Sequence, residues 1–245
     1  MRYMGGKTRI AAQIGAIMRA GRNGRNTYIE PFIGGGSVAA EMAPEFSTAH
    51  LSDANEDLML LWKAVQDGWI PPTDLPYEEW LALKHATEPS ALRAFAGFGV
   101  SFGGRWFTSY ARNNKGNYYA GASSRTLRRY APKIAHASLY HRDYAAAGEQ
   151  VGPDCVVYCD PPYAGTTGYR NTSGFNSAQF WDTAREWSGT GAQVYVSEYA
   201  APRDFVPVWK LRTPVSINRD EAKEQIEQLF IYGPTLDQIR KDRAR

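Results

Sequence analysis

Apolar residues follow a helical spacing in two stretches of the first part of the chain. They recur every three or four positions over residues 8–20 and again over residues 55–66, which predicts two amphipathic helices. Two short strands are expected at residues 27–30 and 50–53, which lie between these helices. Helices that alternate with short strands in this way are typical of a parallel α/β sheet.

The same rhythm returns after residue 155. The pattern predicts a buried strand over residues 156–159, a helix over 177–187 and a strand over 193–197. Two further strands are expected near residues 208–212 and 228–232. Residues 218–225 between them are polar, and we expect them to form a mobile connection.

Residues 71–135 interrupt this rhythm. Residues 77–95 have a helical pattern, whereas residues 97–126 are rich in glycine, aromatic and basic residues and show no clear period. A short helix is expected near residues 125–135 and a strand over 138–142. We therefore predict a catalytic α/β domain made of residues 1–70 and 136–245, with residues 71–135 inserted as a mostly helical or irregular subdomain.

Charge is distributed unevenly between these parts. The whole chain has a formal net charge of +3. Residues 76–150 carry ten Lys and Arg against five Asp and Glu, a net charge of +5, which leaves −2 for the rest of the chain. A basic middle between slightly acidic flanks suggests that the inserted segment binds a polyanion.

The cysteine count and the hydropathy indicate a reducing, cytoplasmic location. Cys155 and Cys159 fall on one face of one predicted strand, so we interpret them as small core residues rather than a disulfide. Two cysteines are also too few ligands for a zinc site. No run reaches the roughly 18 apolar residues that span a membrane, and the N-terminus has no apolar signal-peptide core, so no membrane association is expected.

A glycine-rich loop joins the first predicted strand to a short helix in the stretch YIEPFIGGGSV, residues 28–38. Glycines let a ligand approach the backbone, and the start of a helix over residues 38–42, with Ser37 as its expected N-cap, supplies free N–H groups. Asp53 ends the second strand, where nucleotide-binding α/β folds place an acid that binds a ribose. Alternatively, Asp53 only caps the helix that begins near Asn55.

The stretch GGKT at residues 5–8 contains part of a phosphate-binding loop. That motif needs a preceding strand, for which the sequence leaves no room, so we do not predict an ATPase. Lys7 could meet a carboxylate or phosphate of a ligand, or the stretch could be a flexible lead-in to the first helix.

The buried strand over residues 156–159 ends in an acid, two prolines and a tyrosine, here called the DPPY segment (residues 160–163). A carboxylate at a strand end is costly unless it faces water or a partner, and the prolines fix the direction of the chain. Asp160 and the Pro161 carbonyl can accept both hydrogens of an exocyclic amino group, which leaves its lone pair free for attack, while Tyr163 can stack on the base. A turn without a ligand is the simpler alternative.

Together these stretches resemble Dam-type DNA adenine-N6 methyltransferases of the alpha class. The matching stretches occur in the family's order and span nearly the whole chain: RYMGGK (2–7), EPFIGGGSV (30–38), LSDANEDL (51–58), VVYCDPPY (156–163), VYVSEY (194–199) and QLFIY (228–232). The resemblance implies a Rossmann-like class I S-adenosylmethionine-dependent methyltransferase sheet with helices on both faces. It also implies direct methyl transfer to N6 of an adenine flipped out of duplex DNA, with S-adenosylhomocysteine as the second product and no metal.

The resemblance also implies roles for individual residues. Asp53 would bind the ribose of the donor, Asp160 would lie between the donor and the target amine, and Tyr163 would stack on the flipped adenine. The cofactor-binding residues that it implies are Tyr3, Lys7, Glu30, Pro31, Phe32, Gly34, Gly36, Asp53 and Asp160. The catalytic residues that it implies are Asp160, Pro161, Pro162 and Tyr163.

The family places target recognition between Asp53 and Asp160, which is where the basic segment lies. We expect double-stranded DNA to be contacted by Arg105, Arg112, Asn113, Lys115, Arg125 and Arg128. Eight aromatic residues occur between positions 95 and 119, and aromatic rings among cations suit base contacts and the filling of the gap that a flipped base leaves. The alternative is a small hydrophobic core with solvated charges, and both interpretations can hold together.

The sequence departs from the family pattern in three places. Tyr3 stands where the family often has Trp, and Ser197-Glu198-Tyr199 stands where cellular Dam enzymes often have Asn-His-Asp. The recognition segment also differs from the GATC-reading pattern, so the resemblance does not carry GATC specificity over to this chain and the recognition sequence stays open. The short chain and this variant segment suggest a phage or prophage enzyme that acts as a monomer or weak dimer on nucleoid or phage DNA in the bacterial cytoplasm.

Three rival functions remain open at the level of sequence. The same chemistry could act on adenine in RNA or on N4 of cytosine. The chain could also be a DNA-binding module that has lost catalysis, although the intact DPPY segment and Asp53 argue against this. A small-molecule methyltransferase is disfavoured by the net charge of +5 on residues 76–150.

Overall fold

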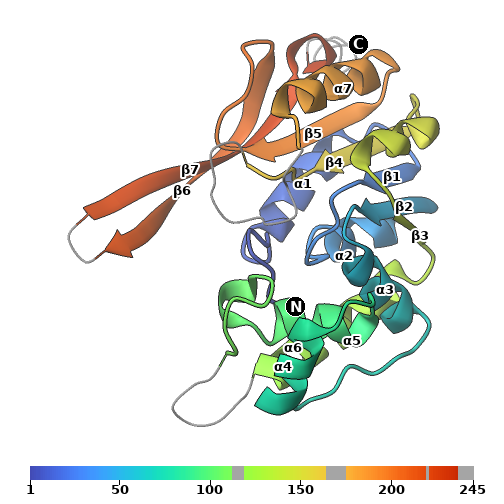
Figure 1. Cartoon of the computed structure of the whole chain (residues 1–245). Coiled ribbons are helices and arrows are strands. Elements are labelled where there is room, and N and C mark those ends of the chain that lie inside the picture. The colour runs from blue at the N-terminus through green and yellow to red at the C-terminus, as the bar shows by residue number, and fades with distance from the viewer. Residues whose placement is uncertain (112–118, 164–174, 219–220, 237–245) are drawn as a thin grey trace. The chain divides into compact units, whose positions relative to one another are not determined.

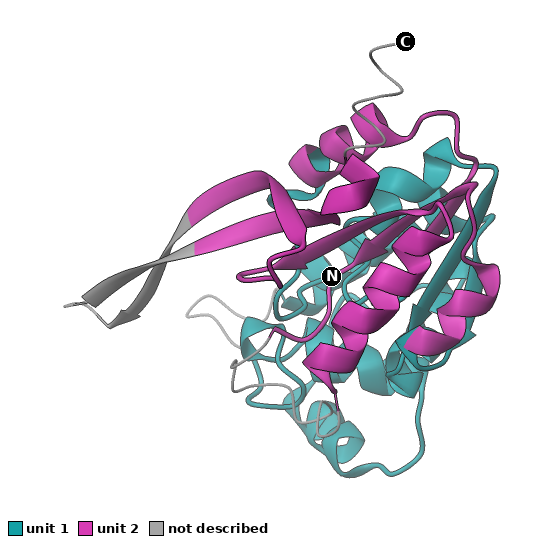
Figure 2. Cartoon of the chain, turned by 90° about the horizontal axis from the view of Figure 1, so that it is seen from above, with its two compact units in different colours: residues 1–12, 31–144 teal, residues 13–30, 145–245 magenta. Residues whose placement is uncertain are grey.

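The computed structural model describes residues 1–111, 119–163, 175–218 and 221–236. The chain forms two compact units, and each is built from two stretches of sequence (Figure 2). Unit 1 contains residues 1–12 and 31–144, and unit 2 contains residues 13–30 and 145–245. The predicted insertion at residues 71–135 lies wholly within unit 1, and its status as a separate subdomain stays a prediction. No helix in the described residues has the length and hydrophobicity needed to cross a membrane.

Unit 1 contains two parallel strands, β2 (Thr48–Asp53) and β3 (Ser138–His141), paired with Asp53 opposite His141. Helix α3 (Glu56–Gln66) follows β2 at once, because the Asn55 side chain accepts a hydrogen bond from the Leu58 N–H at 2.9 Å and so caps the helix. The other α-helices assigned to this unit are α2 (Ala39–Met42), α4 (Tyr77–His85), α5 (Ala91–Ala94) and α6 (Tyr119–Tyr130). A π-helical turn occupies Phe95–Gly99, and short 3-10 turns occupy Ala43–Glu45, Phe102–Gly104 and Ala131–Ile134.

The aromatic residues after α5 form a core within unit 1. Phe95, Phe98 and Phe107 are buried, and the rings of Phe98 and Trp106 lie 4.8 Å apart. This confirms, for these residues, the interpretation of the segment as a small hydrophobic core. Phe102 differs, because 64% of its surface is exposed.

A partly buried ion pair ties this region to α3. The Asp57 carboxylate accepts hydrogen bonds from the Ser90 N–H at 2.8 Å and from the Arg93 guanidinium at 2.5 Å. The Arg93 guanidinium also lies over the Trp106 ring, 5.0 Å from its centroid. The backbone at the start of α5 and the aromatic core are therefore both fixed to the helix that follows Asp53.

The described residues of unit 2 form five strands, in the order β1 (Thr27–Glu30), β4 (Cys155–Cys159), β5 (Gln193–Glu198), β7 (Glu221–Tyr232) and β6 (Phe205–Asn218) (Figure 1). The first three are parallel, and β7 runs antiparallel to both β5 and β6. Helix α7 (Ser177–Gly189) links β4 to β5, and most of α1 (Ala11–Gly21), which precedes β1, belongs to this unit, as does most of the 3-10 turn Tyr144–Gln150.

Every residue of β4 and β5 is buried, as is typical of parallel strands covered on both faces. Both cysteines lie in β4 and carry free, buried thiols. Parallel strands linked by helices, with an antiparallel strand beside the last parallel one, confirm the predicted Rossmann-like α/β fold class.

The two last strands are longer than their sequence pattern indicated. β6 and β7 pair from Phe205 opposite Tyr232 to Asn218 opposite Glu221, and Figure 1 shows them as one long ribbon. Our prediction of a connection over residues 218–225 was therefore wrong for residues 221–225, which belong to β7. The backbone of these polar residues is satisfied by the ladder with β6, and local polarity does not reveal a partner strand.

The expected helix cap at Ser37 is also absent from the structure. Helix α2 begins at Ala39, its N-cap is Val38, and no side chain caps it. The prediction was wrong because the preceding glycines turn the backbone so that Ser37 precedes the cap position. The Gly36 carbonyl instead accepts a hydrogen bond from the Ala40 N–H at 3.0 Å.

Candidate active site

The glycine turn (residues 34–36) in unit 1 is shaped by two aromatic side chains. Gly34 and Gly36 have φ angles of +46° and +69°, a conformation that other residues rarely adopt. A Cβ atom on Gly34 would lie 2.9 Å from the Tyr3 ring, and one on Gly36 would lie 2.4 Å from the Trp62 ring. The Trp62 indole N–H also donates to the Gly34 carbonyl at 3.0 Å. The turn therefore requires glycine and is held in a fixed shape.

Asp53 connects this turn to the start of α3. One carboxylate oxygen accepts the Gly34 N–H at 3.1 Å, and the other accepts the Asn55 N–H at 3.0 Å. The N-cap of α3 is Asn55, so capping this helix does not account for the bonds that Asp53 accepts. Burial raises the pKa of Asp53 from 3.8 to about 6, against the opposing effect of the hydrogen bonds from Asn55, Gly34 and Ala54 and of nearby His141. At neutral pH the side chain is a carboxylate with acceptor capacity to spare.

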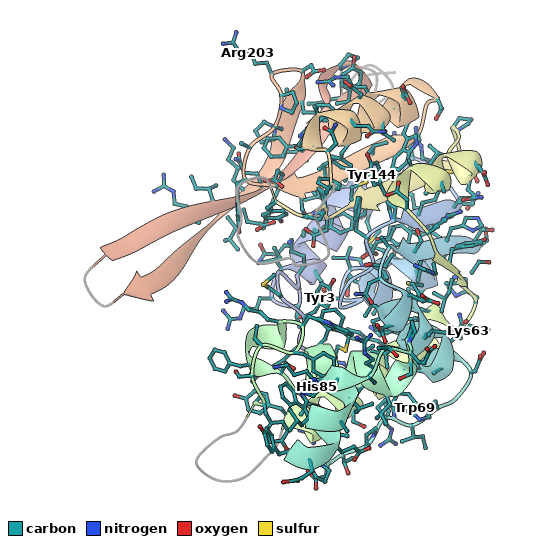
Figure 3. All side chains as sticks on the ribbon, viewed as in Figure 1. Tyr3, Lys63, Trp69, His85, Tyr144 and Arg203 are labelled. Atoms are coloured by element: carbon teal, nitrogen blue, oxygen red, sulfur yellow. The ribbon has the colours of Figure 1, made fainter. Side chains whose placement is uncertain are left out.

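The remaining predicted donor-binding residues of unit 1 all precede the turn in the sequence. Lys7 is 6% exposed and donates to the Gly5 carbonyl at 3.0 Å. Pro31 is buried, and the Phe32 ring stacks on the Tyr144 ring with centroids 5.4 Å apart. Figure 3 labels Tyr3 and Tyr144.

Two residues of this group were missed by sequence reasoning. Trp62 is expected only as part of the apolar face of α3, and nothing local links it to a carbonyl 28 positions earlier. Tyr144 could have been found, because it follows the predicted strand over residues 138–142. The end of that strand lies next to Asp53, since the Arg142 N–H donates to the Asp53 carbonyl at 3.1 Å, and Tyr144 follows two residues later.

The DPPY segment follows β4 in unit 2. Pro161 is buried, while Asp160, Pro162 and Tyr163 are half-buried. Beneath it, the hydroxyls of Tyr158 and Ser197 form a hydrogen bond of 2.9 Å between β4 and β5. A buried strand with a satisfied polar pair at its end gives the segment a rigid base.

Glu30 ends β1 in the same unit. Its carboxylate is 2% exposed and accepts a hydrogen bond of 2.6 Å from the Tyr28 hydroxyl. Burial, followed by the charge of Glu30, raises the pKa of Tyr28 well above its ordinary value, so the hydroxyl remains a donor. The carboxylate has further acceptor capacity, and its predicted contact with the donor stays a prediction.

Tyr163 is held by residues from the antiparallel side of the sheet. Its hydroxyl donates a short hydrogen bond to the Glu227 carboxylate of β7. Its ring meets the Tyr199 ring edge-on, with centroids 4.5 Å apart. Glu227 was missed by sequence reasoning, because it lies 64 positions from Tyr163 and precedes the nearest matching stretch.

Three of the predicted DNA contacts lie within the described residues. Arg105, Arg125 and Arg128 are all exposed, and the latter two belong to α6. Arg112, Asn113 and Lys115 lie outside the described residues. All six stay predictions.

A family model decides the identity of this arrangement. Residues 3–88 and 106–216 match the D12 class of N6 adenine-specific DNA methyltransferases, and these two stretches contain the glycine turn, Asp53 and the DPPY segment. The chain belongs to this family. It is accordingly an S-adenosylmethionine-dependent enzyme that methylates N6 of adenine in DNA.

Curated relatives agree with this membership. A DNA adenine methylase from Haemophilus influenzae is 28% identical over 201 residues, which cover 74% of this chain and 68% of the relative. A DNA adenine methylase from Salmonella typhi is 24% identical over 241 residues, 84% of this chain and 86% of the relative. The type II methyltransferase M.MjaIII from Methanocaldococcus jannaschii is 26% identical over 215 residues, 74% of this chain and 73% of the relative.

The residues of unit 1 suit the donor of this reaction. The space that a Cβ of Gly34 or Gly36 would need is filled by the Tyr3 and Trp62 rings, which hold the turn in place next to Asp53. Asp53 places a carboxylate beside that turn, at the carboxyl end of β2, where a ribose diol can donate to it. The observed groups therefore match the ribose part of S-adenosylmethionine.

Proposed function

We propose that this methyltransferase acts on an adenine flipped out of duplex DNA and that its two units divide the work. The glycine turn, Asp53 and the residues around them in unit 1 bind the donor. The DPPY segment of unit 2 binds the target amine and base. The observation that supports this best is the fixed Tyr163 ring beside Asp160 at the end of a fully buried strand.

The proposed chemistry assigns a separate task to each group. S-adenosylmethionine supplies a methyl group on a positively charged sulfur, so no covalent bond to the protein is needed. The Asp160 carboxylate and the Pro161 carbonyl accept the two N6 hydrogens and aim the nitrogen lone pair. As the new N–CH3 bond forms and the S–CH3 bond breaks, N6 loses one proton, for which Asp160 is the nearest acceptor in the DPPY segment. The contribution of the chain is orientation and exclusion of water.

The proposed DNA-binding surface uses the basic residues of unit 1. Arg105, Arg125 and Arg128 are exposed and can reach phosphates, which fixes the position of the duplex but does not read its sequence. The remaining proposed contacts, Arg112, Asn113 and Lys115, lie outside the described residues. We further propose that the enzyme works as a monomer or weak dimer on nucleoid or phage DNA in a bacterial cytoplasm, where both its substrates are found.

Sequencing that detects N6-methyladenine tests this proposal directly. The chain is expressed in a methylation-deficient bacterium beside the Asp160→Ala variant. A single modified motif that is absent with the variant supports the proposal and gives the recognition sequence. Modified cytosine, modified RNA, or no modification from a well-expressed protein that binds S-adenosylmethionine would contradict it.

A further inference from the structure

Glu227 is a buried acid that none of the matching sequence stretches includes. It lies on β7, with 8% of its surface exposed, in register with Leu211 of β6. Its carboxylate accepts the hydrogen bond from the Tyr163 hydroxyl. Burying a carboxylate is costly, and a hydrogen bond from a neutral hydroxyl to a charged acceptor offsets part of that cost.

The neighbouring β7 residue, Gln228, is bonded to the backbone of Tyr199, the aromatic neighbour of Tyr163. The Gln228 amide N–H donates to the Tyr199 carbonyl at 2.6 Å, and Gln228 pairs with Glu198 of β5. Tyr199 in turn meets Tyr163 edge-on. Two consecutive β7 residues therefore fix this pair of rings. Glu227 holds the hydroxyl of Tyr163, and Gln228 holds the backbone of Tyr199.

The hydroxyl of Tyr163 keeps its proton over the working range of pH. Burial, then the carboxylates of Asp160 and Glu227, raise the pKa of Tyr163 well above its ordinary value. The contact is accordingly a lasting donor-to-carboxylate bond. This bond holds the hydroxyl end of the Tyr163 ring, which could otherwise move by rotation about the side-chain bonds.

We propose that Glu227 is a positioning residue that orients the Tyr163 ring for stacking on the target adenine. This inference rests on the proposed role of the DPPY segment. Glu227 is assigned no contact with the donor or the base, and its proposed effect on methyl transfer passes through the Tyr163 hydroxyl. A Phe at position 163 would keep the ring but lose its anchor, so it should behave like the loss of Glu227.

A double-mutant cycle measures this dependence. Single-turnover methylation is followed at saturating donor and DNA for the wild type, Glu227→Gln, Glu227→Leu, Tyr163→Phe and the Tyr163→Phe/Glu227→Leu double variant. Ile226→Ala is the matched control, because Ile226 is the adjacent β7 residue, is 37% exposed and points to the opposite face of the strand. Donor affinity and melting temperature are recorded for each variant.

The expected result is non-additive. Glu227→Leu and Tyr163→Phe each slow methyl transfer about tenfold, the equivalent of one hydrogen bond to a charged group, while donor affinity stays within about twofold. Glu227→Gln keeps an acceptor oxygen and loses less than about threefold. In the Tyr163→Phe background, Glu227→Leu costs less than about twofold, because its route of action is already gone.

Two outcomes overturn the proposal. Equal costs of Glu227→Leu in both backgrounds would show that Glu227 acts independently of Tyr163. A wild-type rate for Tyr163→Phe would show that the anchor is unimportant, and this test holds even if Glu227→Leu fails to fold. If the wild type transfers no methyl group to adenine, the proposed function fails as well, which separates the two failures.

Discussion

Asp53 has a structural task, and we propose that the same side chain also binds the donor. Its two oxygens accept N–H groups from Gly34 and Asn55, so it fixes both the glycine turn and the start of α3. These bonds leave lone pairs for a ligand. Burial nevertheless brings its pKa to about 6, within reach of ordinary buffers.

The raised pKa of Asp53 gives opposite pH effects on folding and on donor binding. Between pH 3.8 and about 6 the folded chain keeps a proton on Asp53 that the unfolded chain releases. This group therefore favours the folded state fully at low pH, and its contribution is lost as the pH rises through about 6. A ribose diol needs the ionised acceptor, so donor affinity should fall as the pH decreases through the same range.

We expect S-adenosylmethionine to bind roughly tenfold more weakly at pH 5 than at neutral pH. One pH unit below the pKa of about 6, only about a tenth of the Asp53 side chains are ionised. Calorimetric titration at several pH values measures this. The Asp53→Asn variant is the control, because it cannot ionise and should bind weakly at every pH. An unchanged wild-type affinity across the range would contradict the ribose role of Asp53.

Asp160 should affect the chemical step and leave DNA binding nearly intact. We expect Asp160→Ala to lower the rate of methyl transfer by on the order of 10²-fold or more, since it removes the acceptor that orients N6. DNA affinity should stay within about threefold, because phosphate contacts supply most of it. Gel-shift titration and incorporation of labelled methyl groups measure the two quantities, and retained activity would refute the assignment of Asp160.

At the scale of elements, the glycine turn can be tested against another glycine with a similar backbone conformation. Gly36 has φ +69° and its Cβ would meet the Trp62 ring at 2.4 Å, whereas Gly24 has φ +78° and nothing within 4 Å. Both substitutions place an alanine in the left-handed region, which is unfavourable for its backbone, but only Gly36→Ala also overpacks the site.

We expect Gly36→Ala to lower the free energy of unfolding by about 2–4 kcal/mol and Gly24→Ala by about 1–2 kcal/mol. Urea denaturation measures both. Gly36→Ala should also lose donor binding, because the turn must shift to admit the methyl group, while Gly24→Ala keeps it. Equal destabilisation by the two substitutions would mean that the Trp62 contact yields easily.

The elements near the site differ in how far sequence could predict them. Strands β4 and β5 are predicted by continuous apolar runs, and α3 by its helical period, because burial on both faces or on one face leaves a local pattern. The extent of β6 and β7 could not be read locally, since residues 221–225 are polar and gain strand structure only from a partner. Trp62 and Glu227 act on residues far away in sequence, so their roles needed the fold.

At the scale of the whole chain, the boundary between the units falls inside the stretch EPFIGGGSV (30–38), which resembles the family's motif. Glu30 belongs to unit 2, and Pro31 begins the second stretch of unit 1. The stretch EPF thus supplies residues to both units. Most predicted donor-binding residues lie in unit 1 together with the exposed arginines of α6, while the DPPY segment lies in unit 2.

Charge distribution over the chain predicts where salt will act. Residues 76–150 carry a net charge of +5 and the rest of the chain carries −2, so phosphate contacts are expected from the former. Each phosphate neutralised by a cation releases counterions, which gives the logarithm of the binding constant a slope of about −0.9 per contact against the logarithm of salt concentration.

Arg125→Gln and Arg128→Gln in α6 should therefore each make that slope shallower by about one unit. Arg203→Gln is the matched control, because Arg203 is also an exposed arginine, labelled in Figure 3, but lies in unit 2 outside the basic segment. Fluorescence anisotropy with one duplex at several salt concentrations gives the slopes. A slope that changes with Arg203→Gln and not with the α6 variants would move the DNA-binding surface away from the basic segment, because counterion release reports only the cations that meet phosphates.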